Sequence, residues 1–333
     1  MKRREDLIKE MKAAQAELMQ RWKDRVQGAI EGFVIGECLE DRSPIDRQKQ
    51  VSDAHWAVNT DVWCAFIEHL VSYQQLEQAD RVAVMRLYEA ELPTDHLIWS
   101  QSYEENPEQT VEALGGQKPL SFPDFVVARA LFAGFWRYQS MDTVTQNAEH
   151  LCRLTHSNRE VIGAGVVVAY LLHKLLKEEY FSRDELIWLS RMYSERVADY
   201  VVYAYDANLH FLKPNTSEDE VTTQLKAMGM ALWAVLQDQP FFDTYAYLSR
   251  ELRFFRPSQA VAVALLGAKV GSAAIPGRIG EMRGHLTAYR GSSLAYKADG
   301  HEKISGYVSG RISALLHVLV TDLRAQDSLL IIP

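Results

Sequence analysis

Apolar residues in this chain recur at spacings of three and four, and that rhythm decides which class of fold it can adopt. Residues 5–27 carry one apolar stripe on an otherwise charged segment, made of Leu7, Met11, Ala14, Leu18, Trp22 and Val26. Residues 162–176 are apolar nearly all round, which is typical of a helix at the centre of a bundle. No alternating pattern is long enough to build a sheet. The sequence therefore predicts an all-α protein.

Further helical periods occupy residues 183–205 and 217–236. Ser217 and Glu220 have the spacing of a capping box, which predicts a helix start. Three prolines stand where a helix could begin: Pro240, Pro257 and Pro276. Three stretches rich in polar residues, glycine or proline predict loops: residues 40–54, 104–123 and 290–303.

Composition excludes several classes of protein. No apolar run reaches the roughly 18 residues that span a bilayer, and the charged start at Met1–Asp6 lacks the apolar stretch of a signal peptide. We therefore expect a cytoplasmic protein with no membrane contact. A net charge of −8 argues against nucleic acid and suits a basic protein partner. The three cysteines lack the spacing of a zinc site or a disulfide framework and are expected to fill small core sites: Cys38, Cys64 and Cys152.

Four segments follow one another in an order seen in a known family. Gly28–Leu39 is similar to G-A-L-x-G-x-A-x-G-D-A-L, with Glu37 at the acidic position, and Leu154–Asn158 matches L-T-H-x-x. Ala231–Leu236 is similar to A-L-W-A-L-L, and Ala260–Pro276 to a small-residue helix with an A-I-P exit. Together these segments resemble the ADP-ribosylglycohydrolase family, of the dinitrogenase-reductase-activating glycohydrolase type. The resemblance implies an orthogonal multi-helix bundle.

The first metal-binding signature of that family, W-T-D-D-T, corresponds to Trp56–Thr60. Asn59 and Thr60 offer only neutral oxygens. Asp61 lies one residue beyond the signature, and we interpret it as a first-turn residue that favours the helix dipole. Magnesium is held by carboxylates and waters, and a two-metal site needs bridging anions. The replacement therefore argues against a metal at this position.

The last signature is altered in the same way. Its D-T-D-T turn falls on residues 254–257, so Phe254 and Arg256 stand at carboxylate positions. A cation there would repel a dication at short range. A third segment, G-N-G-x-x-M-R, retains only Arg129. We therefore expect no metal, no cofactor and no catalytic residue. The residual site positions are Glu37, Asn59, Thr60, Asp61, Arg129, Phe254 and Arg256.

Two side chains offer residual chemistry. His156 could act in acid–base catalysis, but no nucleophile is assigned beside it, and a satisfied, buried histidine is the favoured interpretation. Glu37 could serve as a general base if an apolar pocket tuned it, although no metal would orient the ribose. The aromatic residues of this region are expected to fill an obsolete cavity rather than stack on adenine: Trp56, Trp63, Phe254 and Phe255.

The G-A-L-x-G signature begins only at residue 28, so we divide the chain into an amphipathic extension, residues 1–27, and a glycohydrolase-like domain, residues 28–333. The extension either packs on its own domain or reaches into a partner's groove. Some family members are immunity proteins against ADP-ribosyltransferase toxins. The resemblance thus implies a pseudoenzyme of a toxin–antitoxin pair that binds its cognate toxin directly. The alternatives are a hydrolase with an altered active site and a non-catalytic ADP-ribose reader.

Overall fold

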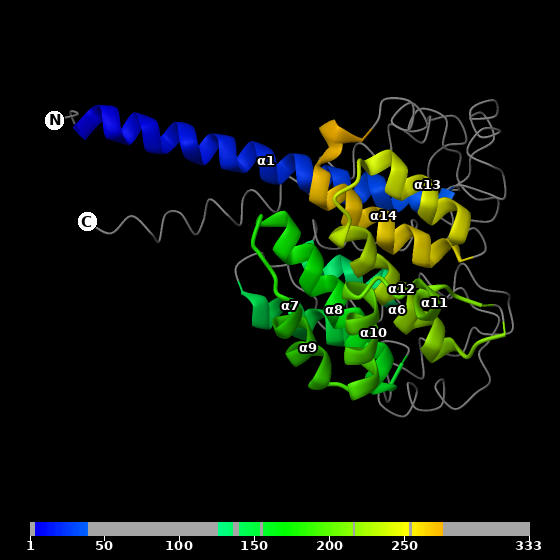
Figure 1. Cartoon of the computed structure of the whole chain (residues 1–333). Helices are drawn as coiled ribbons and strands as arrows, with labels where there is room; N and C mark the ends of the chain where they lie inside the picture. Colours follow the sequence, from blue (N-terminus) through cyan, green and yellow to red (C-terminus); the bar gives the residue numbers. More distant parts are fainter. Residues whose placement is uncertain are drawn as a thin grey trace, which may run out of the picture.

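The computed structural model describes residues 4–38, 126–135, 140–153, 156–215, 217–252 and 255–275, and every element in these ranges is a helix. The helices form a bundle from which one long helix projects (Figure 1). In chain order they are α1 (Arg4–Cys38), α6 (Val126–Leu131), η4 (Phe132–Phe135), α7 (Met141–Cys152), α8 (Arg159–Leu176), α9 (Arg183–Arg191), α10 (Glu195–Tyr205), α11 (Leu209–Leu212), α12 (Glu220–Leu236), α13 (Phe241–Glu251), α14 (Arg256–Val270) and η5 (Ser272–Ala274). The predicted all-α class and multi-helix bundle are confirmed.

Helix α8 forms the centre of the bundle. Every residue from Val161 to His173 is buried, and helices α6, α7, α12 and α14 all pack against it. Its N-cap is Asn158, whose side-chain oxygen accepts the backbone N–H of Glu160 at 2.8 Å. A helix that is apolar all round is stable only where neighbours cover every side. The predicted central helix is therefore confirmed.

The predicted helix over residues 183–205 is in fact two helices, α9 and α10, separated at residues 192–194. Ser194 explains the break. Its hydroxyl accepts the backbone N–H of Arg196 at 3.1 Å, so it caps the start of α10 instead of continuing α9. The apolar spacing persists through the break because α9 and α10 each bury one face.

Helix α12 begins at Glu220, later than residue 217, where the sequence predicts its start. Its N-cap is Asp219, whose carboxylate accepts the backbone N–H of Thr222 at 2.8 Å. The predicted capping box of Ser217 and Glu220 is therefore wrong. An aspartate directly before the helix caps it well because its charge also complements the positive end of the helix dipole.

Two of the predicted proline helix starts are confirmed. Pro240 is the N-cap residue of α13, and Pro257 is the second residue of α14. A complete capping box, which the sequence analysis did not identify, is formed by Ser182 and Glu185 at the start of α9. Pro276 and the three predicted loops lie outside the described residues.

Helix α1 extends beyond the predicted segment 5–27 and runs without a break from Arg4 to Cys38. From Trp22 onward its apolar stripe is buried in the bundle. Ahead of Trp22 the stripe residues Met11 and Leu18 are exposed, as is Ile8 beside the stripe, and this part of α1 projects from the bundle (Figure 1, blue). The predicted boundary at residue 27 thus falls inside one continuous helix, and the division into extension and domain stays a prediction.

Helices α1 and α14 pack too closely for side chains to fit between them. The α1 side of the contact is a row of glycines at four-residue spacing: Gly28, Gly32 and Gly36. A Cβ built on Gly32 would lie 2.3 Å from the carbonyl oxygen of Val263, and one built on Gly28 would lie 2.4 Å from that of Gly267. Lower residue numbers in α1 meet higher numbers in α14, so the two helices are antiparallel.

Candidate functional site

The antiparallel pair of α1 and α14 brings together two of the predicted signature positions. Gly36, near the end of α1, lies against Ala260 of α14; a Cβ on Gly36 would be 2.6 Å from the Cα of Ala260. Glu37 is the next residue of α1, and Arg256 is the first residue of α14. Both positions therefore stand at the same end of the helix pair, which is the candidate site.

Electrostatics at this end of α14 favour anions. Phe255, the N-cap residue, provides no side-chain cap, and the first turn carries no acidic residue. The positive end of the helix dipole is thus left without a local negative charge on its own helix. Arg256 adds a further positive charge at the first helical position. The acidic residue that the helix pair places at the same end is Glu37 of α1.

The remaining signature residues, Asn59, Thr60, Asp61 and Phe254, lie outside the described residues, as do Trp56 and Trp63. Among the residues that the structure describes, no three His, Cys, Asp or Glu side chains group together in a way that could hold a metal ion. Within the same ranges, no helix combines the length and the apolar character needed to cross a membrane.

Arg129 faces the protein interior. Its side chain is only 1% exposed; Nε donates to the carbonyl oxygen of Leu151 at 2.8 Å, and Nη2 to that of Cys152 at 3.4 Å. These carbonyls lie in the last turn of α7, where no backbone N–H group of the same helix is left to donate to them. The backbone N–H of His156 also donates to the Cys152 oxygen, at 3.1 Å. Arg129 therefore bonds to the end of α7, and Cys152 is buried there as predicted.

His156 is paired with a carboxylate. Its Nε2 lies 2.6 Å from Oε1 of Glu220, the first residue of α12. An ionised carboxylate only accepts hydrogen bonds, so Nε2 carries the proton in this contact. The His156 side chain is 15% exposed. His156 is therefore hydrogen-bonded as predicted, but it is not fully buried.

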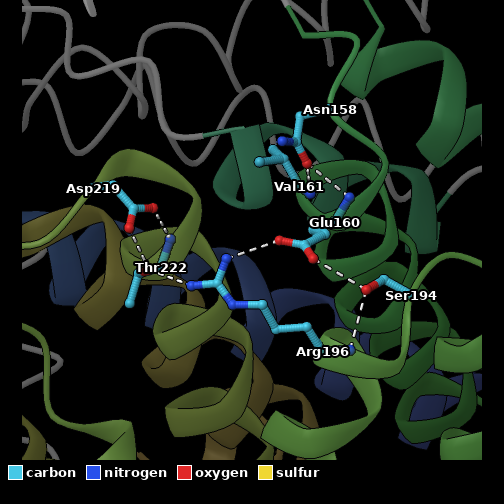
Figure 2. A network of polar contacts seen from close by, with 7 residues as sticks. All are labelled: Asn158, Glu160, Val161, Ser194, Arg196, Asp219 and Thr222. Carbon is cyan, nitrogen blue, oxygen red and sulfur yellow. Dashed lines mark hydrogen bonds and ion pairs between the residues drawn. The ribbon is translucent and has the colours of Figure 1, made fainter.

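Three helix starts converge in a polar network (Figure 2). Their capping residues are Asn158 of α8, Ser194 of α10 and Asp219 of α12. Glu160 accepts from the Ser194 hydroxyl at 3.1 Å and from Nη1 of Arg196 at 2.9 Å. Nη2 of Arg196 donates to the hydroxyl of Thr222, which itself donates to the Asp219 carboxylate at 2.7 Å. The network joins α8, α10 and α12 at one end.

The network and the neighbouring histidine pair contain three carboxylates and one guanidinium: Glu160, Asp219 and Glu220, and Arg196. The backbone N–H of Thr222 holds the pKa of the Asp219 carboxyl below its usual range, so this cap stays ionised at neutral pH. The contacts of Arg196 and Glu160 are to each other and to neighbouring hydroxyls. Such an arrangement rigidifies the ends of three helices.

This network was not predicted from the sequence. Its capping residues carried a local signal, because each is an Asn, Ser or Asp directly before a helical period. The contacts of Arg196, by contrast, have no local signal in the sequence. Its partners Glu160 and Thr222 are 36 and 26 residues away in sequence, and no spacing rule links residues that far apart.

The fold is an all-α bundle in which two signature positions, Glu37 and Arg256, lie at the same end of one tightly packed helix pair. The sequence profile of the ADP-ribosylglycohydrolase family matches residues 18–300, and the chain belongs to that family. A solved structure described as an ADP-ribosylglycohydrolase-related protein complex is similar, with a TM-score of 0.58 and 16% identity over 91% of this chain and 99% of that chain. At this identity the likeness shows the fold alone. No curated protein matches the chain.

Proposed function

We propose that this chain is a catalytically inactive member of the ADP-ribosylglycohydrolase family that acts by binding a protein partner. The observation that carries the proposal is the position of Arg256. It is the first residue of α14, at the end of the helix pair where Glu37 lies near the end of α1. The positive charge of Arg256 adds to the positive end of the helix dipole. That combination disfavours a dication where the family signature has carboxylates.

The donor set fits a two-metal centre poorly. Such a centre needs several carboxylates to ligate the ions and to offset their charge. Among the residual positions only Glu37 and Asp61 are carboxylates; Asn59 and Thr60 are neutral, and Phe254 has no donor atom. No metal-dependent hydrolytic step follows from this set.

A hydrolase rebuilt around Glu37, Asp61 and Arg129 is the competing function. Arg129 argues against it, because its side chain is 1% exposed and bonded to the carbonyls that end α7. The guanidinium would have to give up those buried hydrogen bonds to reach a substrate, which costs free energy. Binding without hydrolysis is therefore the better supported function. A reader of free ADP-ribose is a second form of that function.

The partner that we propose is a cognate ADP-ribosyltransferase toxin, which this chain would neutralise in the cytoplasm as an immunity protein. A net charge of −8 complements a basic partner and would speed association with it.

The first test measures metal binding and turnover. Calorimetry with Mg²⁺ or Mn²⁺ in chelator-treated buffer is expected to show no saturable site, because the two carboxylates of the donor set are too few to hold a pair of dications. The purified protein is expected to release no ADP-ribose from modified arginine or serine. A metal-dependent hydrolase of the same family serves as the positive control. A pair of tightly bound ions, or turnover that disappears in Glu37→Gln, would support the rebuilt hydrolase instead.

The second test concerns the partner. A toxin encoded beside this gene is expected to copurify with the chain as a stoichiometric complex, and specific interfaces of that kind bury roughly 1,200–2,000 Å². The association rate is expected to fall as salt rises, because screening weakens the attraction of an acidic protein for a basic one. The absence of such a toxin, together with micromolar binding of free ADP-ribose, would replace this function with that of a reader.

A further inference from the structure

The first turn of α14 lies at the candidate site and has no side-chain cap. Its N-cap residue, Phe255, carries no oxygen that could accept a backbone N–H group, and the turn contains no acidic residue. The N-caps of α8, α10 and α12 are Asn158, Ser194 and Asp219, and each accepts a backbone N–H of its own helix. The backbone donors at the start of α14 are therefore left without an acceptor from their own N-cap.

A buried hydroxyl in the same turn also lacks a partner. Ser258, the third residue of α14, is 0% exposed, and its Oγ forms no hydrogen bond within the part of the chain that the structure describes. The Cα–Cβ bond of a helical residue tilts toward the helix N-terminus, so this hydroxyl is directed toward the start of α14. A buried donor without an acceptor costs free energy. An acceptor bound at the start of α14 would remove that cost.

The neighbouring buried amide does not supply that acceptor. Gln259 is also 0% exposed, and its Nε2 donates to the hydroxyl of Ser249, on α13, at 3.0 Å. The Oε1 of Gln259, which has no partner among the described residues, belongs to the same amide and therefore lies on the α13 side of the helix. Consecutive residues differ by about 100° around a helix axis, so Ser258 faces another side.

Charge selects the kind of acceptor. The positive end of the helix dipole and the charge of Arg256 both favour an anion at the start of α14. Glu37, at the same end of the helix pair, adds one negative charge and so disfavours a ligand group that carries more than one. A carboxylate is a singly charged group that only accepts hydrogen bonds. We propose that the start of α14 binds a carboxylate, and that an acidic side chain of the protein partner supplies it; the source of the carboxylate rests on the proposed function.

The first turn of α14 reaches the surface and offers the donors that a carboxylate needs. Phe255 and Pro257, on either side of Arg256, are partly exposed. Pro257 has no N–H group, so the donors of this turn are the backbone N–H groups of Arg256 and Ser258, which have no partner within the helix, and the Ser258 hydroxyl. The two oxygens of one carboxylate have enough lone pairs to accept from all three donors.

Acetate is the probe that tests this site on the full chain. A titration at constant pH and ionic strength, followed by NMR, is expected to give saturable shifts of the backbone amide signals in the first turn of α14. Ser258→Ala is expected to weaken acetate binding at least about tenfold, because a hydrogen bond to a charged group is lost. Arg256→Gln is expected to weaken it as well, because a positive charge is removed. Ser190→Ala is the matched control, since Ser190 of α9 also has a buried hydroxyl without a partner among the described residues, and it is expected to leave acetate binding unchanged.

Two results would overturn the inference. One is acetate binding that is equally strong in Ser258→Ala, Ser190→Ala and the unaltered chain. The other is tighter binding of inorganic phosphate than of acetate, which would assign the site to a phosphate group. Circular dichroism shows whether each variant is folded, and if Ser258→Ala is not, Arg256→Gln decides.

The source of the carboxylate is tested separately from the site. A toxin that binds Ser258→Ala and Arg256→Gln as tightly as the unaltered chain would overturn the partner as the source and leave the proposed function intact. Acetate binding in the absence of any toxin complex would support the site and contradict the proposed function.

Discussion

Replacing Gly32 by alanine is expected to lower the free energy of unfolding by about 3 kcal/mol. Helix propensity alone predicts the opposite, because alanine is favoured over glycine inside a helix by about 1 kcal/mol. Packing makes the change in the free energy of unfolding unfavourable instead. The new Cβ would lie 2.3 Å from the carbonyl oxygen of Val263 and 3.1 Å from the Cα of Ala264. Both atoms belong to the backbone of α14, so no side chain can rotate away and the two helices must separate.

Denaturant unfolding followed by circular dichroism measures this change. Ala16→Gly is the matched control, since Ala16 is exposed on the same helix and the substitution is expected to cost about 1 kcal/mol through propensity alone. Gly32→Ala should therefore be the more harmful of the two, although propensity ranks them the other way. A Gly32→Ala protein as stable as the unaltered chain would contradict the close approach of α1 and α14.

The fold class was predictable because a helix that is buried on all sides is apolar on every face, and this pattern can be read from the sequence. Helix α8 shows this, since a segment without a polar face has no stable position except at the centre. The predicted helix boundaries are wrong where a side-chain hydrogen bond to the backbone starts or ends a helix within a continuous spacing of apolar residues. Ser194 ends a helical run that looks continuous in residues 183–205, and Asp219 rather than Ser217 starts α12. Which residue caps a helix depends on the structure that surrounds the start of that helix.

The candidate site was predictable only as far as the family signatures reach. Glu37 and Arg256 were recognised from motifs, yet their position at one end of the helix pair depends on the register of α1 against α14, which the glycine row sets. Arg129 shows the opposite case. The motif places it among the site residues, which stays a prediction, and two of its hydrogen bonds go to the carbonyls of Leu151 and Cys152. Any residue offers a backbone carbonyl, so the sequence holds no sign of that partnership.

Acid is expected to destabilise the protein through His173, which lies on α8 and is 1% exposed. Burial, with a smaller effect from the nearby charge of Lys177, lowers the pKa of His173 to about 4. In the unfolded chain the imidazole titrates near its ordinary pKa of about 6.5. Below pH 6.5 the unfolded state therefore binds a proton that the folded state does not, and stability falls until the pH reaches about 4. The whole loss is on the order of 3 kcal/mol.

Denaturant unfolding at a series of pH values between 7 and 4.5 tests this assignment. His173→Gln is expected to flatten the dependence in that window, whatever it does to stability at pH 7, because the titrating group is gone. His210→Gln removes an exposed histidine of α11 and is expected to keep the original slope. Carboxylates act at lower pH: Lys177 holds the pKa of Glu179 below its usual range, so the stability that Glu179 contributes is lost only under more acidic conditions. An unchanged slope in His173→Gln would assign the acid sensitivity to another group.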